Sequence, residues 1–192
     1  MAFLFCGEPL MAVQQPRVEI FLDQSNFYNG LLKQFGDGHF RLDKLVHRIL
    51  DGRQLAKLNI YTGMIDAGRE PQKACAQQSF FRAISHLPFT TQLFSEPLRY
   101  YPNWPSVPPK EKGVDARIVQ DLIIGAVDKT YDVAVLLSGD TDFCEVCRLL
   151  HSRFLVRLET YYPSSRRHLF QSSYPYFTHA EVINKKFYES IQ

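Results

Sequence analysis

Several features that would place this chain in a class are scarce or missing. Its net charge is only +2, which excludes a global field of the kind that attracts nucleic acid or membranes. No apolar run approaches the ~20 residues that span a bilayer, so no membrane partner is expected. The chain has neither an internal repeat nor a low-complexity tract, which excludes a repeat architecture. A polyanionic partner would have to bind a local patch.

Cysteine is also scarce, and its four positions (Cys6, Cys75, Cys144 and Cys147) show no framework spacing. A chain of 192 residues buries a sizeable core without cross-links, so reduced thiols and a cytoplasmic location are expected. Cys144 and Cys147 spell C-x-x-C, but a zinc site needs a second pair. Their spacing places both on one face of a helix, where they are expected to fill the core.

The composition is that of one globular domain, with 45% hydrophobic and 14% aromatic residues. Residues 1–16 are expected to form a flexible N-terminal tail, and residues 17–192 a single domain. The opening "MAFLFCGEPLMA" lacks a basic n-region and contains Glu8 and Pro9, which argues against a signal peptide.

Apolar strand-like runs alternate with helical patterns, which predicts an α/β fold with a parallel sheet and helices on both faces. Four stretches have helical spacing: the surroundings of Leu42–Ile49, Ala74–Ile84, Val114–Val127 and Phe143–Leu150. The expected strands are Arg17–Asp23, Lys57–Asp66, Phe89–Leu98, Asp132–Gly139 and Arg153–Tyr162. A doubly wound sheet of order 3-2-1-4-5 opens a crevice at the carboxyl ends of its first and fourth strands.

Acidic and amide side chains follow those two strands. The first strand ends in "FLDQSNFY", with Asp23 and Asn26, and the fourth in "SGDTDF", with Asp140 and Asp142. Asp115 is in the first turn of the predicted helix that crosses from the third strand to the fourth, and it can reach the same crevice. Asp23 alone could be a helix cap, and Asp142 alone could cap the helix that begins at Phe143, whereas Asp140 comes two residues early for that role. Four crowded carboxylates repel one another, and oxygen-only ligands suit Mg²⁺ or Mn²⁺.

The stretches "FLDQSNFY", "EKGVDARIVQDLI" and "VLLSGDTDFCEVCRLL" resemble, in this order and spacing, the NYN domain family. These are PIN-like ribonucleases and include the bacterial LabA-like proteins. The resemblance covers Arg17 to about Phe177 and implies a Rossmann-like PIN fold with a Mg²⁺- or Mn²⁺-dependent endoribonuclease centre. It implies that the catalytic, metal-binding acids are Asp23, Asp115, Asp140 and Asp142. Asn26 would orient ligands or contact substrate, and Asp121 matches a further acidic position of the family.

Metal-assisted hydrolysis of RNA needs no nucleophilic side chain. Ser138 and Thr141 are therefore interpreted as hydrogen-bonding supports for the carboxylates. A phosphatase with an aspartyl nucleophile is disfavoured, because no acid pair follows the D-x-D motif of Asp140 and Asp142. The remaining alternative is a non-catalytic module that retains the acids and binds RNA or a protein partner.

Basic and aromatic residues are interleaved in two segments, which fits single-stranded RNA. One is the proline-rich "RYYPNWPSVPPKEKG", and the other follows the fifth strand. The candidate substrate-binding residues are Arg99, Tyr101, Trp104, Lys110, Lys112, Arg166 and Arg167. An ordinary solvated surface explains the same composition. The oligomeric state is left open.

Overall fold

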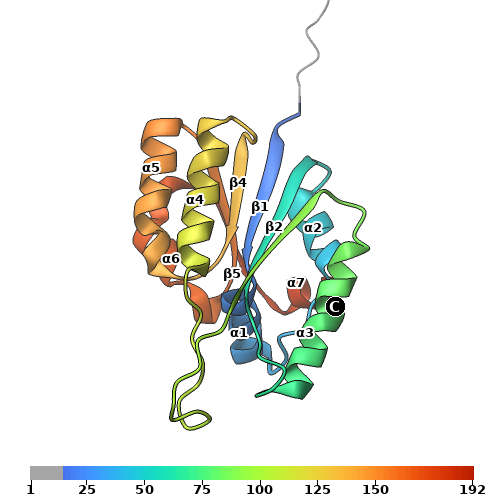
Figure 1. Ribbon diagram of the computed structural model, residues 1–192. Coiled ribbons are helices and arrows are strands. Elements are labelled where there is room, and N and C mark those ends of the chain that lie inside the picture. The colour runs from blue at the N-terminus through green and yellow to red at the C-terminus, as the bar shows by residue number, and fades with distance from the viewer. Residues whose placement is uncertain (1–14) are drawn as a thin grey trace, which may run out of the picture.

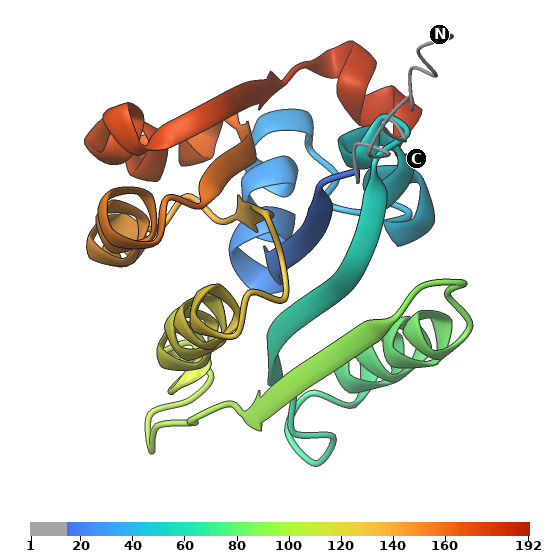
Figure 2. The ribbon, with the colours of Figure 1, turned by 90° about the horizontal axis from the view of Figure 1, so that it is seen from above.

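A six-stranded parallel sheet organises the chain (Figures 1 and 2). The computed structural model describes residues 15–192, so almost all of the expected tail lies outside the described residues. The strand order is β3-β2-β1-β4-β5-β6, and each neighbouring pair is parallel. The strands are β1 (Arg17–Asp23), β2 (Gln54–Met64), β3 (Thr91–Pro97), β4 (Val133–Leu137), β5 (Arg157–Pro163) and β6 (Phe177–Ile183).

Seven α-helices and three short 3₁₀ helices connect the strands within the described residues. They are α1 (Gln24–Phe35), α2 (Leu42–Leu50), α3 (Pro71–Ser85), α4 (Val114–Val127), α5 (Cys144–Phe154), α6 (His168–Ser173), α7 (Lys185–Ser190), η1 (Thr141–Phe143), η2 (Ser164–Arg166) and η3 (Tyr174–Tyr176). In Figure 1, α4, α5 and α6 lie to one side of the sheet, and α2, α3 and α7 to the other.

The expected order 3-2-1-4-5 is confirmed and extended by β6 at the edge. The sequence "FTHAEVI" of β6 mixes polar and small residues over its length and gives no clean strand pattern. The fifth strand begins later than expected, because the helix continues to Phe154 and ends where Leu155 adopts a left-handed conformation.

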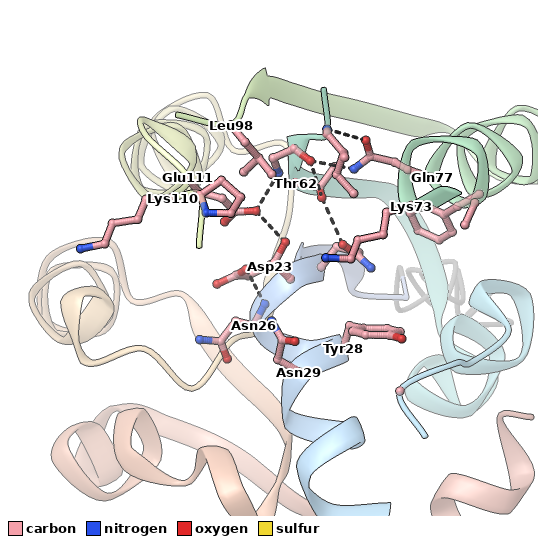
Figure 3. Close-up of a pocket in the computed structure, with 18 of the residues that line it drawn as sticks. Asp23, Asn26, Tyr28, Asn29, Thr62, Lys73, Gln77, Leu98, Lys110 and Glu111 are labelled. Carbon is pink, nitrogen blue, oxygen red and sulfur yellow. Dashed lines mark hydrogen bonds between the residues drawn. The ribbon is translucent and has the colours of Figure 1, made fainter. Parts of the chain in front are cut away.

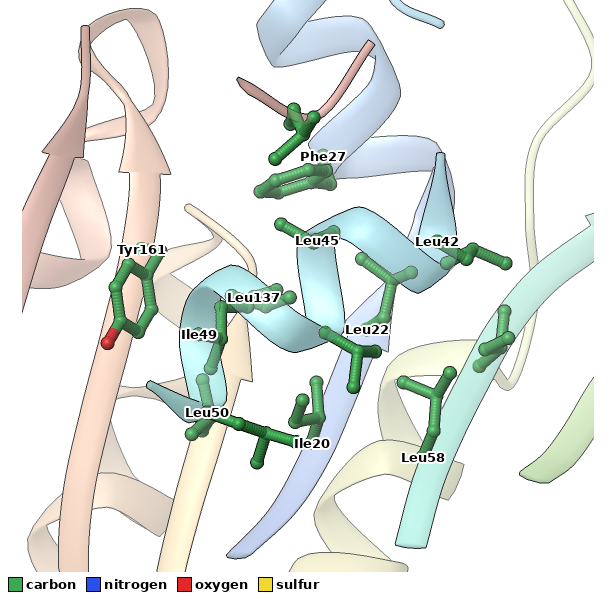
Figure 4. Packing of buried hydrophobic residues seen from close by; sticks show 14 of the residues in the cluster. Ile20, Leu22, Phe27, Leu42, Leu45, Ile49, Leu50, Leu58, Leu137 and Tyr161 are labelled. Carbon is green, nitrogen blue, oxygen red and sulfur yellow. The ribbon is translucent and has the colours of Figure 1, made fainter. Parts of the chain in front are cut away.

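Alternate residues of the central strands enter two separate cores. On β1, Val18, Ile20 and Leu22 face the side covered by α1, α2 and α7, whereas Phe21 faces α4 and α5. Figure 4 shows α2 crossing the first face, with Leu45 and Ile49 directed at the strands. Burial on both faces explains why the β4 sequence "VAVLL" is continuously apolar.

Cys144 and Cys147 lie in the first turn of α5, as their spacing predicted. Cys147 is buried in the core under α4 and α5, and Cys144 packs against that core. Cys75 is exposed on α3, and all three thiols are free. Among residues 15–192, no helix has both the length and the apolar character needed to cross a membrane.

The proline-rich segment forms a projection below the carboxyl ends of the strands (Figure 1). Arg99 and Lys110 pair across its base through two backbone hydrogen bonds, of 2.9 and 3.1 Å. Within the projection, Tyr100 packs edge-on against Trp104, and the guanidinium of Arg69 lies over both rings. These contacts tie the projection to the loop before α3.

We expect the core between the sheet and helices α4 and α5 to contribute strongly to the free energy of unfolding. Ile118 is fully buried on α4, whereas Ile124 is 46% exposed. Ile118→Ala should lower the free energy of unfolding by about 2–5 kcal/mol, because it removes buried methyl groups and leaves a cavity. Ile124→Ala, the matched control, should change it by less than about 0.5 kcal/mol. Urea unfolding measures both, and equal losses would contradict the assigned packing.

Candidate active site

Asp23 connects the ends of the two central strands. It is the last residue of β1 and caps α1, and its Oδ1 accepts the backbone N–H of Asn26 at 3.1 Å. Its Oδ2 accepts the hydroxyl of Ser138, just beyond β4, at 2.9 Å. Only 4% of Asp23 is exposed. Both carboxylate oxygens are therefore held in fixed positions at the sheet's carboxyl edge.

Ser138 and Asn26 extend this connection into the loop after β4. Ser138 Oγ accepts the N–H of Asp140 at 3.2 Å while donating to Asp23. The amide oxygen of Asn26 accepts the N–H of Gly139 at 3.0 Å. The two polar side chains thus hold the residues before Asp140 against the start of α1.

Asp140 is also a cap, contrary to the expectation that it comes too early for one. Its Oδ1 accepts the N–H of Asp142 at 3.1 Å and caps η1, a 3₁₀ turn that precedes α5. The sequence pattern predicted the longer helix but not this added turn. Asp142 and Thr141 are exposed, and neither side chain forms a hydrogen bond among the described residues.

Glu111 is a fourth acid at the pocket that sequence reasoning missed. Its Oε1 accepts the Ser25 hydroxyl at 2.6 Å and the backbone N–H of Gly63 at 2.7 Å. A Cβ on Gly63 would lie 2.8 Å from the Glu111 side chain and 2.2 Å from Leu98. Any larger residue at this position would require Leu98 and Glu111 to shift. The glutamate joins the proline-rich projection to β2 and α1.

The acids perturb one another. Burial raises the pKa of Asp23 to about 7, against the opposing effect of its two hydrogen bonds, and the charges of Glu111 and Asp115 add to the rise. Asp115 lies at the exposed edge of the same site. Partial burial of its carboxylate and the negative charges of Asp140, Glu111 and Asp142 raise its pKa. Raised pKa values in a pocket are typical of functional carboxylates.

One pocket of about 730 Å³ contains Asp23, Glu111, Asp115 and Asp140. Figure 3 shows Asp23 and Glu111 facing its interior, whereas the side chain of Lys110 is directed away from these two acids. Lys110 and Arg166 also line it, and neither forms an ion pair within residues 15–192. The volume is within the usual range of ligand sites, about 300–1,000 Å³.

Arg166 reaches the pocket because Gly139 has no side chain. A Cβ on Gly139 would lie 2.3 Å from the carbonyl oxygen of Arg166 and 2.5 Å from its Cβ. The Nε of Arg166 is buried and has no hydrogen-bond partner among the described residues. A donor in this state favours an anionic ligand.

The family model of the NYN domain matches residues 17–181. The chain belongs to the NYN domain family. A similar solved structure is that of a protein of unknown function, VPA0982, from Vibrio parahaemolyticus RIMD 2210633. The TM-score is 0.69 at 17% sequence identity, over 93% of this chain and 99% of that one. A search of the curated proteins finds no match.

The match confirms the family that the motifs resemble, and the sheet has the expected PIN-like arrangement. NYN domains are nuclease-like, which agrees with a hydrolase at that coarse level. At 17% identity, the likeness to VPA0982 supports the fold alone.

Several expected site residues of this NYN domain lie outside the pocket. Asp142 does not line it. The carboxylate of Asp121 accepts the Tyr61 hydroxyl at 3.0 Å and Arg117 Nε at 2.9 Å, so it stabilises the contact between α4 and β2. Of the expected substrate-binding residues, the following five do not line the pocket: Arg99, Tyr101, Trp104, Lys112 and Arg167.

The donor set of the NYN domain fits a hard cation in its chemistry. The pocket acids supply carboxylate oxygens, the ligands that Mg²⁺ and Mn²⁺ prefer. In the described part of the chain, no three His, Cys, Asp or Glu side chains are placed so that they could hold a metal ion.

The raised pKa of Asp23 predicts an unusual pH dependence of stability without divalent cations. The unfolded state releases this proton near pH 4 and the folded state near pH 7. The free energy of unfolding should therefore fall as the pH rises from about 4 to about 7. Urea unfolding in EDTA measures this slope, which Asp23→Asn should reduce.

Asp132→Asn is the matched control, because Arg17 lowers the pKa of Asp132 and moves its titration below this window. If Asp23→Asn shows the same dependence of unfolding free energy on pH as wild type, the titration does not belong to Asp23.

Proposed function

We propose that this NYN domain is a divalent-metal-dependent endoribonuclease that acts on single-stranded RNA. The observation that carries the proposal is one pocket that joins four acids to two unpaired cations, Lys110 and Arg166. Acids alone would repel a phosphodiester, whereas cations alone would only bind it. Products with a 5′-phosphate and a 3′-hydroxyl are expected from attack by water.

Asp23, Asp115 and Asp140 would hold a Mg²⁺ or Mn²⁺ ion, with Glu111 close by. When bound, such an ion lowers the pKa of water and polarises a phosphate. The donors around Asp23, from Ser138 and the N–H of Asn26, fix its two oxygens before any ligand arrives. Fixed oxygens reduce the reorganisation that ligand binding costs.

Arg166 and Lys110 would bind the phosphate oxygens that face away from the acids. The terminal nitrogens of the Arg166 guanidinium can donate to one phosphate group in a planar, two-pronged fashion. Burial of Asp23 keeps bulk water from one side of the reacting group. Attack by ordered water then needs no nucleophilic side chain.

A non-catalytic RNA-binding module is the second candidate. It is favoured by one observation: within residues 15–192, no three acids are positioned for a metal ion. Purified protein that binds RNA but shows no metal-dependent cleavage would support the non-catalytic module.

The central test removes the negative charge of Asp23 or Asp140 but keeps the helix cap that each residue forms. Asn serves as an N-cap about as well as Asp, so Asp23→Asn and Asp140→Asn should fold normally. Each should lower the rate of RNA cleavage by orders of magnitude in Mn²⁺. The double variant should lose little more, because groups that act as a unit are not additive. Cleavage of an end-labelled RNA, with thermal melting in parallel, measures both properties.

Asp128→Asn is the matched control, since Asp128 is exposed at the far end of α4. It removes the same charge and should cleave like wild type. Full activity in Asp140→Asn would contradict the proposed centre.

Arg166 and Arg167 should differ in RNA binding although they are adjacent. Arg166 lines the pocket, whereas Arg167 is exposed outside it. Arg166→Ala should lower the slope of log affinity against log salt by about 0.7, the value for one phosphate contact with a single strand. Arg167→Ala should leave the slope unchanged. Fluorescence anisotropy in EDTA measures this slope without cleavage. If Arg167→Ala lowers the slope and Arg166→Ala does not, RNA binds outside the pocket.

A further inference from the structure

The pocket extends well beyond the acids. We call this extension the side arm; it lies between α1 and α3 and is lined by Tyr28, Phe40, Ile65, Ala76, Gln77 and Phe80. Figure 3 shows Tyr28 on one wall and Gln77 and Lys73 on the other, with Asp23 at the junction. The acids and phosphate-binding residues do not account for this space.

The walls of the side arm are fixed by contacts of their own. Gln77 donates to the carbonyl of Gly63 at 2.7 Å and accepts the N–H of Ile65 at 2.9 Å, which ties α3 to the end of β2. On the opposite side, Phe40 packs edge-on against buried Phe27 at 5.2 Å. A site with walls held in this way is largely formed before a ligand binds.

The lining combines an aromatic ring with groups that bind polar edges. Tyr28 is half-buried and lies edge-on to His39 at 5.7 Å. Gln24, at the start of α1, accepts the Thr62 hydroxyl through Oε1, and its amide N–H₂ group forms no hydrogen bond within residues 15–192. The Asn29 side chain lines the same space and likewise has no partner in that range. A flat heteroaromatic ring with polar edges matches this lining.

We propose that the side arm is a nucleobase subsite, which holds one unpaired base of the RNA next to the cleaved bond. Stacking on Tyr28 would supply affinity, and the free amides of Gln24 and Asn29 would contact the base edge. The choice of ligand rests on the proposed function, because the base is joined through its ribose to a phosphate at Asp23. A paired base cannot enter, so the subsite requires an unpaired nucleotide.

The test compares adenosine 5′-monophosphate with ribose 5-phosphate, which carries the same phosphate and no base. Wild-type protein should bind the nucleotide about tenfold more tightly, in line with the contribution of one stacked base. Titrations followed by two-dimensional NMR measure both affinities and show whether shifts gather at α1 and α3. Equal affinities for the two probes would overturn the proposal.

Two pairs of variants locate the effect. Ala76 is exposed and lines the side arm, whereas Ala83 is exposed on the same helix outside the pocket. Ala76→Trp should reduce nucleotide affinity to that of ribose 5-phosphate, and Ala83→Trp should not. Tyr28→Ala should act like Ala76→Trp, whereas Tyr28→Phe should retain the preference. An unchanged preference in Ala76→Trp would place the base elsewhere and overturn the proposal.

The two proposals fail in different ways. Base-dependent nucleotide binding that Ala76→Trp abolishes, in a protein that never cleaves RNA, would support the subsite and remove the nuclease. The opposite result has two parts: wild type and Ala76→Trp cleave RNA with metal and with equal KM, and wild type binds both probes equally. That result would support the nuclease and overturn the subsite.

Discussion

The hydrogen bond from Ser138 to Asp23 is the contact on which the site depends. Parallel pairing of β1 with β4 places Leu22 opposite Leu137, so the next residue of each strand meets its counterpart at the sheet edge. There the serine hydroxyl reaches the carboxylate at 2.9 Å. From this point Ser138 also receives the N–H of Asp140. Strand register therefore sets the positions of both acids. The pocket lies at the carboxyl ends of β1 and β4, the two neighbouring strands at the centre of the sheet.

Keeping these acids together opposes folding. Neutral donors satisfy Asp23 and Glu111, but they do not cancel charge, and burial together with the neighbouring carboxylates still raises the pKa values of Asp23 and Asp115. A cluster that only capped helices would not need this repulsion, because Asn caps about as well. The helix caps at Asp23 and Asp140 therefore explain the local backbone and leave the charge unexplained. A ligand with positive charge accounts for it.

The sequence predicted the sheet order and the placement of Asp23 and Asp140 in one crevice, because both follow from apolar strands and the rule for doubly wound sheets. It missed Glu111, since a lone glutamate in a proline-rich loop has no periodic signal and its partners, Ser25 and Gly63, are distant in the chain. It also missed the side arm around Tyr28, which exists only once α1 and α3 pack beside β2. Arg166 and Arg167 were indistinguishable by composition, and backbone geometry separates them.

The placement of Arg166 shows how one small residue sets the chemistry of the pocket. Gly139 is the second residue after β4, and any side chain there would occupy the position of the Arg166 backbone. A side chain at position 139 would push the turn after β5 outward and move Arg166 away from the pocket that Asp23 and Asp140 line. Of the lysines and arginines that line the pocket and form no ion pair within residues 15–192, only Lys110 would then remain. A phosphodiester held between opposite charges therefore depends on close backbone packing at Gly139 as much as on the charged residues themselves.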